Sequence, residues 1–207
     1  MNNKTIAALS IGAIVAAGCA AMTASEDQRR AEALAMMKVS FKANGQATLD
    51  RLDQDEVQRA CSKYHGDTPM PRDVAQQIEK AQLATIKYPA GGYMGDWKAG
   101  ERIAQSGIGK QYSDDPKVVA GGNCYACHQI SKAELSFGTI GPSLYNFAKL
   151  RGYTPDVQKY AYGKVYNPDA FAACSSMPRF GHSAILTEQQ IKDVVALLMD
   201  PESPVNK

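Results

Sequence analysis

Cys124-Tyr125-Ala126-Cys127-His128 is the stretch of this chain that decides its fold. The pattern C-x-x-C-H is the attachment site of a c-type haem, in which each thiol adds to one vinyl group and forms a thioether. The adjoining histidine, His128, then supplies the proximal imidazole to the iron. A bare C-x-x-C would be a weaker signal, because redox dithiols and zinc sites also use it. The motif occurs once, so the sequence predicts one covalent haem on Cys124 and Cys127, whose work is to move single electrons.

The N-terminus, residues 1–24, is typical of an export signal. Lys4 provides a short positive region, and residues 6–17 form an apolar stretch that is too short to span a bilayer comfortably. Export agrees with the haem motif, because c-type haem is attached outside the cytoplasm. We therefore expect a periplasmic protein.

The end of this segment leaves two routes open. Ala16-Ala17-Gly18-Cys19 resembles a lipoprotein signal, in which cleavage before Cys19 would leave a lipidated N-terminus. The first position of that pattern is usually Leu rather than Ala16, which favours ordinary cleavage within residues 20–24 and a soluble product. Association with a membrane is expected only if Cys19 is lipidated.

The composition excludes some partners. The chain has 23 Lys and Arg residues against 21 Asp and Glu residues, and loss of Lys4 leaves 22 against 21. Two haem propionates would make the balance slightly negative, so nothing indicates a nucleic-acid partner. No other apolar run is long enough to cross a membrane.

Two segments on either side of the motif predict helices. The first covers residues 96–104, with Asp96 as N-cap and Gly100 inside it. Glycine is costly within a helix, so Gly100 either lets another helix approach closely or is a tolerated surface glycine. The second begins with a capping box of Thr187 and Gln190. Its apolar residues follow the spacing of one buried stripe: Ile191, Val194, Val195 and Leu198.

The segment before the haem domain is a mostly helical arm. We expect helices over residues 26–42 and 46–64, parted near Asn44-Gly45, and a third helix over 75–86 with Asp73 as its cap. The sequence therefore predicts an all-α protein divided into a signal segment at 1–24, an N-terminal arm at 25–92 and a haem domain at 93–207.

The later motifs resemble those of class I c-type cytochromes. Gly138-Thr139-Ile140-Gly141-Pro142-Ser143-Leu144 contains their Gly-Pro turn, and Ser175-Ser176-Met177-Pro178-Arg179-Phe180-Gly181 their methionine loop. The resemblance implies that the Pro142 carbonyl accepts a hydrogen bond from the far nitrogen of His128, although a plain turn is the alternative. It also implies that Met177 is the second axial ligand, whose neutral thioether favours ferrous iron and raises the reduction potential.

Other residues compete for these roles. His182 follows Met177 closely and His65 lies in the arm, and a bis-histidine haem would have a lower potential. A lone histidine is more often a surface residue, which favours Met177. Arg179 is expected either to pair with a haem propionate or to lie on a docking surface.

Two cysteines, Cys61 and Cys174, remain after haem attachment. An even remainder in an oxidising compartment indicates a disulfide, which would join the arm to the methionine loop. Two buried free thiols, or an intermolecular link through Cys61, are the alternatives.

Taken together, the haem-side motifs are similar to those of the SoxX cytochromes of the bacterial sulfur-oxidation system. The resemblance covers roughly residues 93–206 and leaves out the arm. Besides the two motifs quoted for class I cytochromes, it rests on Gly121-Gly122-Asn123 with the haem motif, Arg151-Gly152-Tyr153, Tyr166-Asn167-Pro168 and the ending Asp200-Pro201-Glu202-Ser203-Pro204-Val205.

The resemblance implies a class I cytochrome c domain and a role as a subunit. SoxX pairs with SoxA, whose haem has a cysteine-derived ligand. The SoxAX complex oxidatively couples thiosulfate to a cysteine of the SoxYZ carrier and releases two electrons, which is an L-cysteine S-thiosulfotransferase activity. The haem of this chain would accept electrons and pass them to a small cytochrome c. No catalytic residue is expected on this chain itself.

Two other classes remain open. A free-standing periplasmic electron carrier would need neither an arm nor an obligate partner. A haem enzyme such as a peroxidase would need an open iron position, which Met177 would fill.

Overall fold

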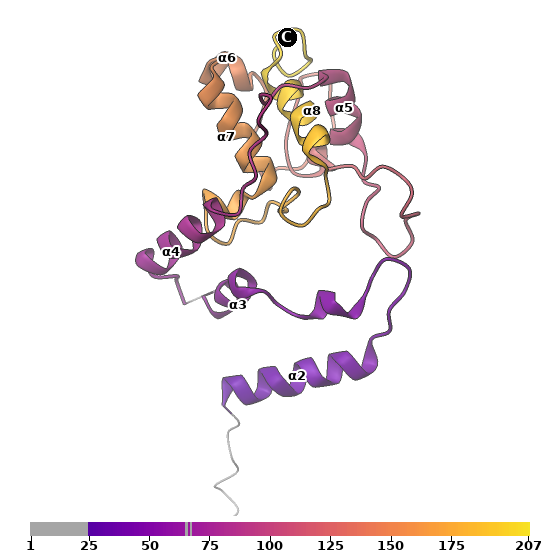
Figure 1. The fold of residues 1–207 in the computed structure, drawn as a ribbon, viewed down its shortest axis with the longest axis vertical. Helices are drawn as coiled ribbons and strands as arrows, with labels where there is room; N and C mark the ends of the chain where they lie inside the picture. The colour runs from indigo at the N-terminus through magenta and orange to yellow at the C-terminus, as the bar shows by residue number, and fades with distance from the viewer. Residues whose placement is uncertain (1–24, 65, 67) are drawn as a thin grey trace, which may run out of the picture. The chain divides into compact units, whose positions relative to one another are not determined.

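The computed structural model describes residues 25–64, 66 and 68–207. They fall into two compact units, one ending at Lys42 and the other running from Ala43 to Lys207. Every regular element in the described ranges is a helix (Figure 1), which confirms the all-α class. None of these helices has the length and apolar character needed to cross a membrane. The predicted export signal, including Lys4 and Cys19, lies outside the described residues.

The first unit contains one helix, α2, over Glu26–Ser40. Ser25 begins it with a capping box, in which its hydroxyl accepts a hydrogen bond from the Gln28 N–H and the Gln28 side chain accepts one from the Ser25 N–H. None of its residues is buried. The helix predicted at 26–42 is therefore confirmed to within two residues.

The centre of the second unit is the pair formed by α5 (Trp97–Gln105) and α8 (Glu188–Met199), which lie side by side in Figure 1. A Cβ added at Gly100 would lie 2.1 Å from the Asp193 carbonyl oxygen and 3.1 Å from Leu197 Cβ. No side chain fits there, which confirms that Gly100 permits the close approach of a second helix.

The two predicted caps of these helices are confirmed. The Asp96 carboxylate accepts a hydrogen bond from the Lys98 N–H, and Thr187 and Gln190 form a capping box. The predicted stripe of α8 is buried, with exposed fractions between 0 and 6% for Ile191, Val194, Val195 and Leu198. Full burial of such a side chain stabilises the fold by about 1.5–3 kcal/mol.

Two further helices, α6 (Phe147–Arg151) and α7 (Pro155–Tyr166), pack against α8. The C-terminal tail then satisfies backbone groups at the end of α8. The Ser203 hydroxyl donates to the Leu197 carbonyl at 2.6 Å, and the Asn206 amide donates to the Leu198 carbonyl at 3.0 Å. Because helix ends leave carbonyls without partners, these buried polar residues complete the helix rather than destabilise the core.

The arm differs in detail from the prediction. A break at Gly45 is confirmed, since its φ of +52° is in the left-handed region that favours glycine. The single helix expected over 46–64 is wrong: a 3₁₀ turn, η1, covers Leu49–Leu52, and α3 begins later and covers Glu56–Lys63. The reason is a capping box between Asp55 and Gln58, which starts a new helix at this point.

The third arm helix, α4, covers Arg72–Leu83. Its N-cap is Pro71, so the prediction of Asp73 as the cap is wrong. Asp73 lies instead in the first turn, where a carboxylate interacts favourably with the helix dipole.

Residues 43–92, assigned from the sequence to the arm, lie in the same compact unit as residues 93–207. Helix α4 packs against η3 (Pro168–Ala170). The buried Asn167 amide donates to Gln82 Oε1 at 2.9 Å and to Thr85 Oγ1 at 3.0 Å. Most of the predicted arm is therefore joined to the helices around the haem motif.

Candidate haem-binding site

A cavity of about 610 Å³ lies against the C-x-x-C-H motif. The motif lines this cavity with Cys124, Cys127 and His128. Met177 also lines it, from a loop much later in the chain. Apolar side chains from α7 and α8, such as Val165, Leu197 and Leu198, form much of its wall. Its size falls in the range of small-molecule and cofactor sites, about 300–1,000 Å³.

The motif itself forms a tight turn, η2, over Cys124–Ala126. The N–H groups of Cys127 and His128 both donate to the Cys124 carbonyl, at 3.1 and 2.9 Å, and Asn123 precedes the turn in the left-handed conformation. Neither Cys124 nor Cys127 takes part in a disulfide. Desolvation raises the pKa of the Cys124 thiol to about 12.

The Gly-Pro turn packs directly onto the histidine. His128 Nδ1 lies 2.7 Å from the Pro142 carbonyl oxygen, which can only accept, so Nδ1 carries the proton and Nε2 presents its lone pair to a metal. A Cβ at Gly141 would lie 2.2 Å from His128 Cε1. The glycine therefore leaves room for the imidazole, and the carbonyl fixes the ring and its tautomer.

The distal side of the cavity favours methionine over its rivals. Met177 is partly buried, packs against the hydrophobic core and lines the cavity. His182 is exposed and does not line it. His65 lies outside the described residues. Met177 is thus the side chain that the fold brings to the same cavity as His128.

Two cationic side chains line the cavity and were missed by sequence reasoning. Arg151 lies over the rings of Phe147 and Tyr160, and Lys164 follows Tyr160 by one turn of α7. Burial lowers the pKa of Lys164, although Asp169 and Glu79 act in the opposite direction. None of the described residues that line the cavity is Asp or Glu. The charge of this lining therefore suits an anionic group such as a haem propionate.

Arg179 is paired with carboxylates of this chain. Its guanidinium pairs with Asp55 and with Asp169 at 3.8 Å, its side chain is only 14% exposed, and it does not line the cavity. The arm therefore supplies a carboxylate partner for Arg179 that the sequence did not reveal. The propionate contact and the docking surface stay predictions.

The remaining cysteines lie on the arm side of the methionine loop. Cys61 in α3 and Cys174 are joined as a disulfide, which links residues 113 positions apart. The loop that carries Met177 is therefore attached covalently to the arm.

Comparison with known proteins agrees with this geometry. The family model for cytochrome c matches residues 109–200, the segment that contains the haem motif and Met177. A protein of Aquifex aeolicus (strain VF5), described as an "uncharacterized lipoprotein", is 39% identical over 213 residues, with full coverage of both chains. The chain belongs to the family of this protein. The cytochrome c domain of the present chain implies covalently bound haem c and a location outside the cytoplasm, where haem c is attached.

Among solved structures, this cytochrome matches the crystal structure of SoxXA from P. pantotrophus. The identity is 26%, and the match covers 57% of this chain and 90% of that chain, with a TM-score of 0.39.

Proposed function

We propose that this chain is the electron-accepting c-type cytochrome subunit of a SoxAX-type complex, which couples thiosulfate to a carrier-protein cysteine. The observation that carries the proposal is the single cavity lined by Cys124, Cys127, His128 and Met177. When bound there, a haem c supplies one-electron chemistry. Four of the six stretches that resemble SoxX contribute residues to the lining of this cavity, which supports the link between the electron-transfer site and this family.

Each cavity residue has a proposed task. The two thiols would hold one haem covalently, His128 Nε2 would bind its iron with Pro142 fixing the imidazole ring, and Met177 would be the second iron ligand. With both His128 and Met177 as ligands, the iron would have no open position for a substrate, which favours electron transfer over peroxidase chemistry. Arg151 and Lys164 offer positive charge to the propionates.

The cavity reaches the surface on one side. Ile140 lines the cavity and is 76% exposed, so the edge of a bound haem would lie close to solvent there. A partner that docks on this edge would bring its own redox group within a short distance of the haem. We place the SoxA-type subunit and a small cytochrome c acceptor on this side of the chain.

The electron balance is consistent with a subunit. Joining thiosulfate to a carrier thiol releases two electrons and one proton, whereas one haem takes one electron at a time. The partner's haem and an external cytochrome c must therefore share the electrons. The cysteine chemistry belongs to the partner, and the carrier is of the SoxYZ type.

Reconstitution tests this function. The partner subunit, carrier and thiosulfate are mixed with and without this chain, with an oxidised cytochrome c as final acceptor, and the carrier mass is followed. The proposal expects multiple turnovers only with the chain present. Equal turnover without it would support the runner-up, a free-standing periplasmic electron carrier.

The chain's attachment to the membrane is a separate question. We propose a periplasmic location, with lipidation of Cys19 as the alternative to ordinary cleavage, and the lipoprotein description of the 39% identical relative supports the lipid route. Detergent phase partition and N-terminal mass analysis of the native protein, beside Cys19→Ser, distinguish the two. Partition into the aqueous phase by both proteins would exclude the lipid anchor.

A further inference from the structure

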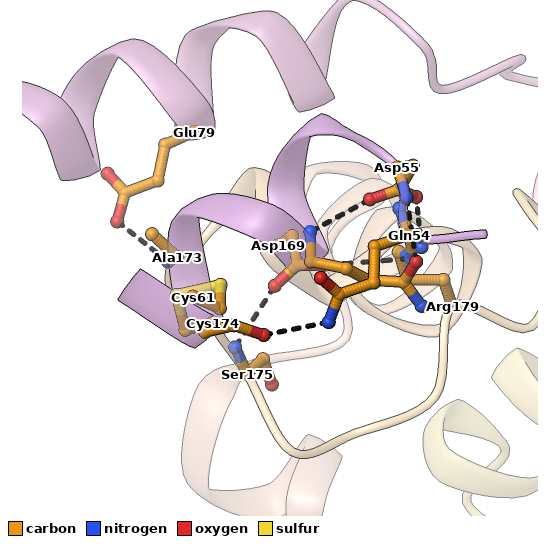
Figure 2. Close-up of a disulfide and its surroundings, with 11 residues drawn as sticks. Gln54, Asp55, Cys61, Glu79, Asp169, Ala173, Cys174, Ser175 and Arg179 are labelled. Atoms are coloured by element: carbon orange, nitrogen blue, oxygen red, sulfur yellow. Dashed lines mark hydrogen bonds and ion pairs between the residues drawn. A yellow bond between two sulfur atoms is a disulfide. The ribbon is translucent and has the colours of Figure 1, made fainter. Parts of the chain in front are cut away.

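The loop that carries Met177 is held on both sides by one arm helix, α3. Cys174, three residues before Met177, is joined to Cys61 in α3 by the disulfide. Arg179, two residues after it, pairs with Asp55, the N-cap of α3 (Figure 2). The ends of one short helix thus hold the two flanks of the methionine loop.

Two further carboxylates hold the same segment. Asp169, whose side chain is 8% exposed, accepts a hydrogen bond from the Ser175 N–H at 3.0 Å and lies 3.8 Å from Arg179 Nε. Glu79 of α4 accepts one from the Ala173 N–H at 3.2 Å, as Figure 2 shows. Residues 173–179 are therefore fixed at several points, most of which belong to the arm.

Of the contacts that hold the methionine loop, we single out the ion pair between Arg179 and Asp55 of the arm. The Arg179 guanidinium is largely removed from water, and a buried cation requires a closely paired anion. Without the Asp55 charge, its remaining carboxylate partner would be Asp169 at 3.8 Å, which already accepts from Ser175. Loss of that charge therefore loosens the loop just after Met177.

We propose that Asp55 is a positioning residue for Met177, and that the arm acts as a clamp that keeps this thioether on the iron. The inference rests on the proposed function in one respect, the assignment of Met177 as axial ligand. A thioether is a neutral ligand that other ligands can displace, so the rigidity of its loop decides how easily it leaves. The arm lies outside the resemblance to SoxX, and its proposed role is to hold Met177 in position to bind the iron.

The structure offers a sharp substitution. Asp55→Asn removes the charge but keeps a side chain that caps helices as well as aspartate does, so α3 retains its start. Asp55→Glu restores the charge. Asp50→Asn, in the exposed turn η1, makes the same change of charge elsewhere on the arm and is the matched control.

The test measures displacement of the methionine in the oxidised full-length holoprotein. Imidazole is titrated into wild type and each variant, and loss of the weak far-red absorption band of methionine-ligated ferric haem is followed. Asp55→Asn should raise the apparent affinity for imidazole about threefold, the change expected from a partly exposed ion pair. Asp55→Glu, which keeps the charge but is a weaker N-cap, should return part of the way to wild type, and Asp50→Asn should match wild type.

The outcomes separate the clamp from the ligand assignment. If Asp55→Asn binds imidazole as Asp50→Asn does, while the band is present in wild type and absent in Met177→Ala, the clamp is wrong and the ligand assignment stands. If the band is absent in wild type or persists in Met177→Ala, the ligand assignment itself fails and the clamp with it. A rise in Asp55→Asn that Asp55→Glu reverses supports the clamp.

Discussion

Replacing Gly100 with alanine should destabilise this protein strongly, although alanine is the better helix former. In an ordinary helix interior the change would stabilise by about 1 kcal/mol. Here the new Cβ would lie 2.1 Å from the Asp193 carbonyl oxygen, 2.6 Å from its carbonyl carbon and 3.1 Å from Leu197 Cβ. The first two atoms are backbone, so no rotamer change can relieve the overlap, and α5 must move away from α8.

The expected cost follows from what surrounds this contact. Overpacking a core costs about 1–3 kcal/mol even where side chains can rearrange. Movement of the α5–α8 pair also opens the cavity that Ala104 and Leu197 line. We therefore expect Gly100→Ala to lower the free energy of unfolding by about 3 kcal/mol or more.

The assay is guanidinium denaturation of the oxidised holoprotein followed by far-ultraviolet circular dichroism. Gly91→Ala is the control, because a Cβ there meets no atom within 4 Å and the residue lies outside the helices. That variant should stay within about 0.5 kcal/mol of wild type. Wild-type stability of Gly100→Ala would refute the close crossing of the two helices.

The structure also predicts the effects of three further substitutions on stability or on the midpoint potential. Replacing Cys61 and Cys174 together by alanine should lower the free energy of unfolding by about 2–5 kcal/mol, since the bond spans a sequence separation of 113, and a loss below about 1 kcal/mol would contradict it. The stability difference between wild type and Asp55→Asn should disappear in acid. Burial opposes ionisation of the Asp55 carboxyl, but its interactions with the Gln58 N–H and Arg179 outweigh burial and lower the pKa of Asp55 below 3.8. The stability that the Asp55 charge contributes is therefore complete above about pH 4 and is lost as the pH falls through that lowered pKa. With the Asp55 side chain 43% exposed, the difference at neutral pH should not exceed about 1 kcal/mol, and a difference that persists at the lowest pH where both proteins fold would exclude the ion pair as its source. Finally, Lys164→Gln should lower the midpoint potential by about 20–40 mV, because loss of a positive charge near the haem favours the ferric state, and an unchanged or higher potential would contradict the proposed place of the propionates.

Features that depend on residues close together in the sequence were the most predictable part of this molecule. The capping box of Thr187 with Gln190 and the Asp96 cap involve residues that are neighbours in sequence, so their geometry follows from the pattern. The apolar stripe of α8 is equally local. The sequence indicated a close approach at Gly100 because glycine destabilises a helix interior and is rarely used there without a packing role.

Long-range pairings explain the failures. Arg179 and Asp55 are 124 residues apart, and nothing in either neighbourhood indicates the other. Lys164 looks like an ordinary lysine of a helix until the fold places its face of α7 against the cavity. In the arm, the box at Asp55 and Gln58 was overlooked because the residues before it continue a helix-like composition, so one long helix was predicted where a turn and a short helix occur.

The site was predictable to the extent that it consists of motifs. The place of the two thiols and His128 follows from C-x-x-C-H, and the turn at Pro142 from a familiar pattern. The surroundings that tune the site were not predictable. Arg151 and Lys164 reach the cavity by tertiary packing alone, and Asp169 reaches the methionine loop in the same way.

If the haem of this chain accepts electrons from thiosulfate coupling, one optical measurement on the assembled complex will show it. The far-red band of a methionine-ligated ferric haem belongs to this chain, because the partner's haem is expected to carry a cysteine-derived ligand. The oxidised complex of the two subunits is mixed rapidly with carrier and thiosulfate while this band is followed. We expect the band to disappear at the rate at which the carrier becomes conjugated, and to persist when the carrier is omitted. A band that stays constant while the carrier is fully conjugated would show that the electrons do not pass through this chain.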